Sequence, residues 1–274
     1  MKINRIAAVY YSATGNTKRV ILTLGKQLSR LLDAPLEEFD YTLPASRNKH
    51  YSFSSDDLVL FATPVYAGRV PNKMLSFVET GFSGNGALAL PVVTFGNRSF
   101  DQGLIELKAI LEKNGFSPVA AAAVATSHVF SDSISPGRPD EADWEKLNRF
   151  ICDTAEKVQA LTTPVPVLSL PGEGEELIYY TPLGIDGKPT MFLKAKPQTH
   201  AQLCDGCGIC VAACPMAAID EEDPLLVPGT CIKCQACVRI CPTKAKYFDD
   251  ANFLSHVRML EENYTERKEP QVFV

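Results

Sequence analysis

The first 160 residues alternate between short apolar runs and longer segments with helical spacing. The apolar runs have the length of buried strands and lie at 3–11, 36–39, 58–62, 87–95 and 119–126. The segments between them carry apolar residues three and four positions apart, which predicts helices over 16–32, 71–81, 104–114 and 140–161. This alternation predicts an α/β fold with a doubly wound, five-stranded parallel sheet.

A polar loop follows the first predicted strand. It reads Ser12-Ala13-Thr14-Gly15-Asn16-Thr17 and leads directly into the first helix. In doubly wound sheets ligands bind at the carboxyl ends of the strands, and hydroxyl and N–H groups at a helix N-terminus form a cradle for phosphate. From composition alone, a loop that only caps the helix explains these residues equally well. The loop has neither G-x-x-x-x-G-K-[ST] nor G-x-G-x-x-G, which argues against an NTPase and a dinucleotide site.

Eight of the nine cysteines fall into two runs with one spacing, C-x₂-C-x₂-C-x₃-C-P. The runs are Cys204-Cys207-Cys210-Cys214-Pro215 and Cys231-Cys234-Cys237-Cys241-Pro242, offset by 27 residues. This is the spacing of [4Fe–4S] ligands. A zinc site uses separated pairs and has no role for the third evenly spaced cysteine, and a disulfide framework suits a short secreted chain. The spacing therefore indicates two [4Fe–4S] clusters, which serve electron transfer or, alternatively, structure alone.

The cysteine-rich segment, 199–250, resembles bacterial two-cluster ferredoxins, whose internal duplication it shares. In those proteins the last cysteine of each run ligates the other cluster. The resemblance implies one cluster on Cys204, Cys207, Cys210 and Cys241, and a second on Cys231, Cys234, Cys237 and Cys214. Each repeat is too small for a core of its own, so we expect the clusters to hold a small α+β domain together.

The polar loop at 12–17 resembles the FMN-phosphate loop of flavodoxins, and the succession of strands and helices over 1–163 is similar to that fold. The resemblance implies that two later loops flank the flavin ring. They are Pro64-Val65-Tyr66-Ala67-Gly68 after the third strand, and Gly96, Asn97, Arg98, Phe100 and Asp101 after the fourth. Tyr66 would stack on the ring or only pack at the surface. Arg98 would stabilise a reduced flavin anion or be a solvated loop residue.

A segment rich in proline and glycine, 164–198, joins the two halves. Apolar stretches at 177–180 and 189–193 flank Asp186-Gly187, which predicts a hairpin docked between the domains. A loose tether is the alternative, but it would leave Ile178 and Met191 in water.

The chain is thus expected to have four parts. They are a flavodoxin-like FMN-binding domain (1–163), the bridging segment (164–198), a two-[4Fe–4S] ferredoxin domain (199–250), and a surface helix with a tail (251–274). The ninth cysteine, Cys152, falls within the last helix of the first part. We assign it to the apolar face and expect a buried core thiol.

Charge is spread unevenly along the chain, whose formal net charge is −5. Residues 1–163 hold 17 Lys and Arg and 17 Asp and Glu, whereas 199–250 hold four against seven. This acidic end argues against nucleic acid and favours a redox protein partner with a basic docking face. The apolar runs are too short for a membrane span. The segment MKINRIAAVYYS reads as a strand rather than a signal peptide, so we expect a cytoplasmic protein.

The whole chain resembles the flavodoxin–ferredoxin fusion proteins. The likeness includes the segment Tyr180-Thr181-Pro182-Leu183-Gly184-Ile185-Asp186-Gly187-Lys188-Pro189 before the cysteines. It implies an intracellular electron-transfer flavoprotein that passes electrons between FMN and two [4Fe–4S] clusters and on to protein partners. The alternative is a flavin-dependent reductase of a quinone or nitro compound, fed by the clusters. No acid/base pair or substrate pocket is recognisable in 1–163, which favours the carrier.

Overall fold

The structure is a computed structural model that describes residues 2–162 and 164–274. Met1 and the expected domain boundary at Thr163 lie outside the described residues. The first part contains β1 (Arg5–Tyr10), α1 (Asn16–Leu32), β2 (Leu36–Asp40), η1 (Pro44–Asn48), β3 (Tyr51–Ser52), β4 (Asp57–Pro64), α2 (Asn72–Thr80), β5 (Phe82–Ser83), β6 (Leu88–Phe95), α3 (Gly103–Lys113), β7 (Ser117–Pro118), β8 (Ala121–Ala125) and α4 (Glu141–Ala160). The second contains β9 (Gln198–Thr199), α5 (Ile209–Ala212), α6 (Ala236–Ile240), β10 (Lys246–Tyr247), α7 (Ala251–Asn263) and β11 (Gln271–Phe273).

The five predicted strands form one parallel sheet in the order β2-β1-β4-β6-β8. Counting only these strands, the order is 2-1-3-4-5, which is the flavodoxin-like arrangement. The expected α/β fold is therefore confirmed. Because all five strands are parallel, the loops that follow them gather at one edge of the sheet.

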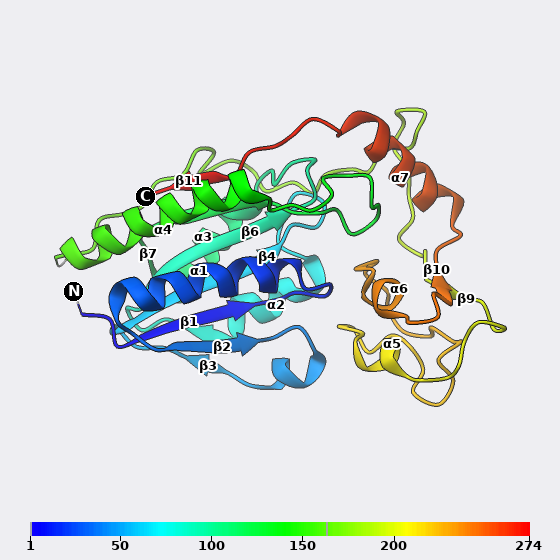
Figure 1. The fold of residues 1–274 in the computed structure, drawn as a ribbon, viewed down its shortest axis with the longest axis horizontal. Coiled ribbons are helices and arrows are strands. Elements are labelled where there is room, and N and C mark those ends of the chain that lie inside the picture. Colours follow the sequence, from blue (N-terminus) through cyan, green and yellow to red (C-terminus); the bar gives the residue numbers. More distant parts are fainter. Residues whose placement is uncertain (1, 163) are drawn as a thin grey trace.

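Helices cover both faces of the sheet, and strand alternation divides the core in two (Figure 1). On β1, Ile6, Ala8 and Tyr10 face the core under α1 and α4. Ala7 and Val9 face the opposite core, under α2 and α3. Burial of both faces is the normal condition of a parallel sheet and explains why its strands read as continuous apolar runs.

The tail after α7 was predicted as irregular, but it adds a further strand to the sheet. β11 pairs antiparallel with β8, with Val272 opposite Ala122. The strand covers an edge that would otherwise leave backbone groups of β8 unpaired. The helix before it is also less exposed than predicted, since Phe253, Val257 and Leu260 are buried.

The predicted hairpin in the bridging segment does not form as two strands. Instead, a tight turn closes around a single bridge between Leu183 and Pro189, with Gly184 N–H donating to Lys188 O at 2.8 Å. Proline has no N–H to extend a ladder. Ile178 and Met191, expected to be covered, are 61% and 73% exposed. The segment is nevertheless not a loose tether, because other parts of it are packed.

Those packed parts are two leucines and two aromatic residues. Leu168 and Leu170 are buried in the core under α2 and α3. Tyr179 lies against the guanidinium of Arg69, 4.4 Å from its ring centroid, and Phe192 packs on Phe253 of α7. The bridge is thus fixed to both halves of the molecule.

Cys152 is exposed, so the expectation of a buried thiol is wrong. Its neighbour Ile151 faces the core, and one residue further along an α-helix turns the side chain by about 100°. Cys152 therefore lies on the outer side of α4.

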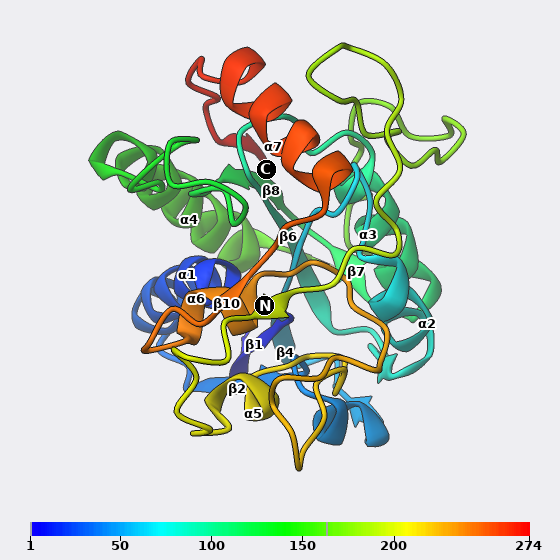
Figure 2. The same ribbon diagram turned by 90° about the vertical axis from the view of Figure 1, so that its right-hand side faces the viewer.

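The cysteine-rich part lies beyond the carboxyl ends of the parallel strands, as Figure 1 shows. Viewed from that side, α5, α6 and their loops lie in front of the sheet, and α7 crosses above them (Figure 2). Throughout 2–162 and 164–274, none of the helices is sufficiently long and apolar to cross a membrane.

Candidate functional site

The loop from Ser12 to Thr17 turns sharply between β1 and α1. Gly15 has a φ of 89°, which glycine adopts without steric cost, and a Cβ there would meet no atom within 4 Å. Lys18 N–H donates to Ser12 Oγ at 3.0 Å, so the Ser12 hydroxyl keeps its own proton to donate.

Two side chains of this loop form hydrogen bonds with neighbouring segments of the chain. Asn16 Nδ2 donates to Ser127 O, which follows β8, at 2.9 Å. Thr17 Oγ1 forms a 2.8 Å hydrogen bond with Thr94 Oγ1 of β6. These contacts hold the start of α1 in register with the carboxyl ends of two other strands.

The donors that remain fit a phosphate group. They are the hydroxyl groups of Ser12 and Thr14 and the N–H groups of Asn16 and Thr17 at the start of α1, which have no partner within a helix. In the part of the chain that the structure describes, the Thr14 hydroxyl makes no hydrogen bond. The positive end of the helix dipole adds to the attraction for an anion.

The loop after β4 is held from two sides. Gln102 N–H donates to Gly68 O at 3.0 Å, and Tyr180 N–H donates to Ala67 O at 2.8 Å. Gly68 has a φ of 82°, and a Cβ there would lie 2.3 Å from Asp101 Oδ2. The second and third predicted flavin loops are therefore in direct contact, and only glycine fits where they meet.

Tyr66, in the same loop, lies beside the cysteine-rich part of the chain. Its ring packs edge-on against Tyr11, with centroids 6.3 Å apart. Burial, and then the negative charges of Tyr11 and Cys234, raise the pKa of the Tyr66 phenol. Stacking of Tyr66 on a flavin remains a prediction, as do contacts from Pro64 and Val65.

The loop after β6 is covered by two other segments. The imidazole of His128 lies over Gly96, where a Cβ would come within 2.2 Å of the ring. Asn97 is buried, and its Nδ2 donates to Tyr264 O at 2.7 Å and to Glu266 O at 2.9 Å. The Asn97 side chain therefore serves to anchor the tail, which leaves the backbone groups of Asn97 for the predicted flavin contact.

Arg98 already has two partners. Its guanidinium forms an ion pair with Asp101 and lies 3.8 Å from the ring centroid of Tyr180. Phe100 packs on Phe95, with centroids 5.5 Å apart. A reduced flavin would have to compete with Asp101 for this cation.

A cavity of about 530 Å³ opens beside the same loop, between Phe95, Phe100 and the tail strand β11. Lys146 and Lys268 contribute to its wall. Neither ammonium group forms an ion pair with any residue that the structure describes. Aromatic walls with two unpaired cations suit a flat organic anion.

Cys214, Cys231, Cys234 and Cys237 line a second cavity, whose other walls are mainly apolar. Within the described ranges, no three His, Cys, Asp or Glu side chains are grouped closely enough to hold a single metal ion. Four thiols around a shared space instead suit a cluster with four iron corners. The structure thus brings together the set expected for one cluster, although its ligation remains a prediction.

The other four cysteines differ widely in exposure. Cys207 is exposed, Cys204 and Cys241 are partly buried, and Cys210 is buried. Burial raises the pKa of Cys210; the nearby Lys246 ammonium opposes this rise, and the nearby Cys241 thiolate adds to it. The last cysteine of the second run therefore lies near the first run, as the ferredoxin pattern implies.

The two last cysteines accept equivalent hydrogen bonds. Ala218 N–H donates to Cys214 Sγ at 3.3 Å, and Ala245 N–H donates to Cys241 Sγ at 3.2 Å. Each donor lies four residues after its cysteine. Such bonds favour the thiolate and tune the reduction potential of a bound cluster.

Burial raises the pKa of Cys234 and of Cys237 to about 12. Metal ligands must be thiolates, so cluster assembly has to displace protons from these two groups. Once bound, iron supplies the positive charge that keeps them ionised.

Two arginines that the sequence did not identify join the halves of the molecule. Arg47 Nη2 donates to Pro215 O, directly after the last cysteine of the first run. Arg239 of α6 donates to Val129 O at 2.9 Å and pairs with Asp132. A single arginine in a short helix carries no sequence pattern that indicates a distant partner.

Comparison with known proteins separates the two halves of the chain. Residues 196–242 match the family model described as 4Fe-4S dicluster domain. The chain is 46% identical over 41 residues to the ferredoxin-type protein NapF of Escherichia coli (strain K12). That match covers 15% of this chain and 25% of the relative, so it spans only a quarter of the curated protein.

The solved structures similar to this chain match its first half. A flavodoxin from the domain Archaea is 14% identical and covers 57% of this chain and 99% of its own, with a TM-score of 0.42. A flavodoxin of Streptococcus pneumonia TIGR4 is 20% identical, with a TM-score of 0.41 and coverage of 56% and 99%. The flavodoxin-like fold itself is established by strand order and pairing. The chain thus joins a flavodoxin-like sheet to a dicluster ferredoxin region.

Proposed function

We propose that this chain is an electron-transfer flavoprotein of the cytoplasm that holds FMN and two [4Fe–4S] clusters. One observation carries the proposal: both candidate sites adjoin the same apolar core. Met216 and Ile232, from the wall of the cysteine cavity, pack against the core that Ala13 and Val65 of the flavin loops also contact. Electrons can cross such a dry contact without leaving the protein.

When bound, FMN supplies chemistry in one- or two-electron steps, and each cluster supplies single-electron steps. Ser12 and Thr14 would hold the phosphate by donating hydrogen bonds, and the first turn of α1 would add its N–H groups. The apolar wall of the cysteine cavity excludes water, which sets the potential of what is bound there.

The proposal includes a protein partner with a basic contact face. Residues 199–250 hold seven acidic and four basic residues, and bound clusters add further negative charge. Opposite charge on the partner would speed the encounter at low ionic strength.

The first test is cofactor content. Protein prepared without oxygen is expected to contain about one FMN and eight iron atoms per chain, and dithionite is expected to bleach both the flavin and the broad iron–sulfur absorption. Protein never exposed to air that lacks iron or fails to bind FMN contradicts the proposal.

The phosphate loop is tested by one substitution and a matched control. Thr14→Val removes a hydroxyl that has no hydrogen-bond partner among residues 2–162 and 164–274. We expect the Kd for FMN to rise roughly tenfold or more, since a hydrogen bond to a charged group contributes about 1.5–3 kcal/mol. Thr23→Val makes the same change on the exposed side of α1, where the hydroxyl donates to Arg19 O at 2.8 Å. Fluorescence titration of the flavin-free protein measures both. Equal affinities for the two variants would place the phosphate elsewhere.

A second candidate function rests on the cavity beside Phe100. Its size of about 530 Å³ and its unpaired Lys146 and Lys268 would suit reduction of an anionic quinone or nitro compound at the flavin. Steady-state assays with such acceptors decide between the two. Saturable turnover that is lost in the Lys146→Met, Lys268→Met double variant favours the reductase.

A further inference from the structure

The two cysteine runs are alike in spacing, but their surroundings differ at equivalent positions. The residue directly after the first cysteine is Asp205 in the first run and Ile232 in the second run. Two residues after the last cysteine, Met216 corresponds to Thr243. Since the repeats share one spacing, these differences point to different contacts around the two sets of cysteines.

The cavity of Cys214, Cys231, Cys234 and Cys237, here the inner set, faces the flavodoxin-like sheet. Ile232 and Met216 belong to its wall and pack against the sheet's apolar core. Arg47 donates to Pro215 O from the same side. At these two positions the residue beside the inner set is thus apolar and touches the sheet, whereas its counterpart beside the outer set is polar.

The remaining cysteines, Cys204, Cys207, Cys210 and Cys241, here the outer set, lie in a more exposed setting. Cys207 is exposed, and so is Asp205, whose Oδ1 accepts a hydrogen bond from Cys207 N–H at 3.1 Å. Leu203 and Ile209 are 51% and 40% exposed on either side of this loop. Apolar side chains beside a carboxylate are typical of a surface for transient contact.

We propose that the two clusters work in series, with the inner set next to the flavin site and the outer set as the port to a second redox protein. The inference rests on the proposed function and adds an order to it. The partner is a one-electron redox protein whose contact face is basic around an apolar centre. Such a face matches Asp205 between Leu203 and Ile209.

Each step transfers one electron. A cluster held by the inner set would take one electron from the flavin and pass it to a cluster held by the outer set, which would pass it to the partner's centre, so that both clusters return to their first state. No bond is made or broken, and no proton has to move. Electron entry from a reduced partner follows the same steps in reverse.

The order can be tested on the intact holoprotein without any assay of activity. An iron chelator such as bathophenanthroline disulfonate is added without oxygen, and freed thiols are alkylated and located by mass spectrometry. We expect the outer set to be labelled as a group before the inner set, with exposed Cys152 as the internal reference for full accessibility. Earlier labelling of the inner set, or release of both sets together, overturns the order.

Electron transfer is tested with a matched pair, Cys207→Ser and Cys234→Ser, which occupy the same position in the two runs. EPR identifies the cluster that each variant retains. With Cys207→Ser, photoreduced flavin is expected still to reduce the remaining cluster, whereas transfer to a basic c-type cytochrome is lost. With Cys234→Ser, electron transfer between the flavin and the remaining cluster is expected to be lost. The reverse pattern contradicts the proposal, and chelation of the wild type decides the order even where a variant does not fold.

The docking face has its own control. Asp205→Asn removes a charge but keeps an acceptor for Cys207 N–H, and Glu145→Gln removes one from the outer side of α4. Only the first is expected to slow reduction of the basic cytochrome, by about two- to threefold at low salt and not at high salt. Equal rates for the two variants exclude this face. A failure of the proposed function itself would be seen in a different measurement, the content of FMN and iron.

Discussion

His128 is a partly buried imidazole whose surroundings oppose its protonation. Burial lowers its pKa to about 4, and the positive charges of His256, Arg239 and Arg98 act in the same direction. Phe130 N–H donates to His128 Nδ1 at 3.1 Å, so the neutral ring carries its hydrogen on Nε2. The ring also covers Gly96 of the third predicted flavin loop. A neutral histidine is therefore part of the packing at this edge of the sheet.

This environment predicts a loss of stability in mild acid. Between pH 6.5 and pH 4 the unfolded chain binds a proton that folded His128 does not, so the free energy of unfolding falls as the pH falls through that window. The contribution is about 2 kcal/mol between pH 7 and pH 5. Urea unfolding at both values measures it. His128→Asn keeps an acceptor for Phe130 N–H and should lose most of the dependence; an unchanged dependence would assign it to other groups.

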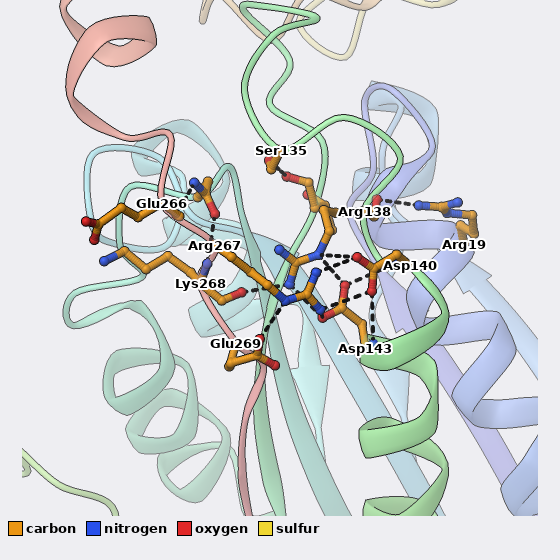
Figure 3. Close-up of polar contacts among 11 residues, drawn as sticks. Arg19, Ser135, Arg138, Asp140, Asp143, Glu266, Arg267, Lys268 and Glu269 are labelled. Carbon is orange, nitrogen blue, oxygen red and sulfur yellow. Dashed lines mark hydrogen bonds and ion pairs between the residues drawn. The ribbon is translucent and has the colours of Figure 1, made fainter.

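The N-terminus of α4 and the segment between α7 and β11 are joined by an ion-pair network (Figure 3). Asp143 is fully buried and accepts two hydrogen bonds from Arg138, one of 2.6 Å at Oδ1. Arg138 also donates to Lys268 O at 2.7 Å, and Arg267 donates to Asp143 Oδ1 at 2.9 Å. One buried carboxylate thus connects a helix of the flavodoxin-like part to the segment returning from α7.

The two arginines of this network should contribute very differently to the free energy of unfolding. Arg138→Met leaves the Asp143 carboxylate buried without the positive charge and hydrogen bonds of Arg138. It is expected to lower the free energy of unfolding by about 3–5 kcal/mol. Arg267 is more exposed, so Arg267→Met should cost far less. Trp144, the only tryptophan, follows Asp143 directly and reports unfolding by its fluorescence. Arg258→Met, on the exposed side of α7, is the control. Equal decreases in the free energy of unfolding for the Arg138 and Arg267 variants would contradict the prediction that burial sets the cost of removing each arginine.

The halves of the molecule are stabilised by different means. The sheet has two large apolar cores, one under each pair of helices. In 199–250 the helices α5 and α6 have four and five residues, and the strand β10 has two. So little regular structure cannot supply a core of ordinary size, which leaves the clusters to hold the region together.

Removal of iron should therefore unfold one half only. After anaerobic chelation we expect protease cleavage within 199–250 to become fast, while Trp144 fluorescence still reports a cooperative transition of the sheet on adding urea. Limited proteolysis with mass spectrometry locates the cuts in iron-loaded and iron-free protein. Loss of the Trp144 transition in iron-free protein, or an unchanged cleavage pattern, would contradict this division.

Local patterns predicted most of the sheet but few of the contacts between its loops. The five strands and four helices could be recognised because buried strands and amphipathic helices leave a period in the sequence. The hydrogen bonds from the Asn97 side chain to the tail were not predicted, and Cys152 was assigned to the wrong face of its helix. A periodic pattern assigns a whole segment more reliably than it places a single side chain. A contact between residues more than a hundred positions apart leaves no periodic pattern in the sequence.

By itself, the sequence determined the alternation of strands and helices that makes a parallel sheet, the polar loop at 12–17 and the spacing of eight cysteines. Each of these is a short-range pattern with a direct physical cause. Only the tertiary structure decided that β11 completes the sheet and that the inner set of cysteines faces it. Equal spacing makes the two runs interchangeable in the sequence. Packing of Ile232 and Met216 against a distant core makes them different in the folded protein.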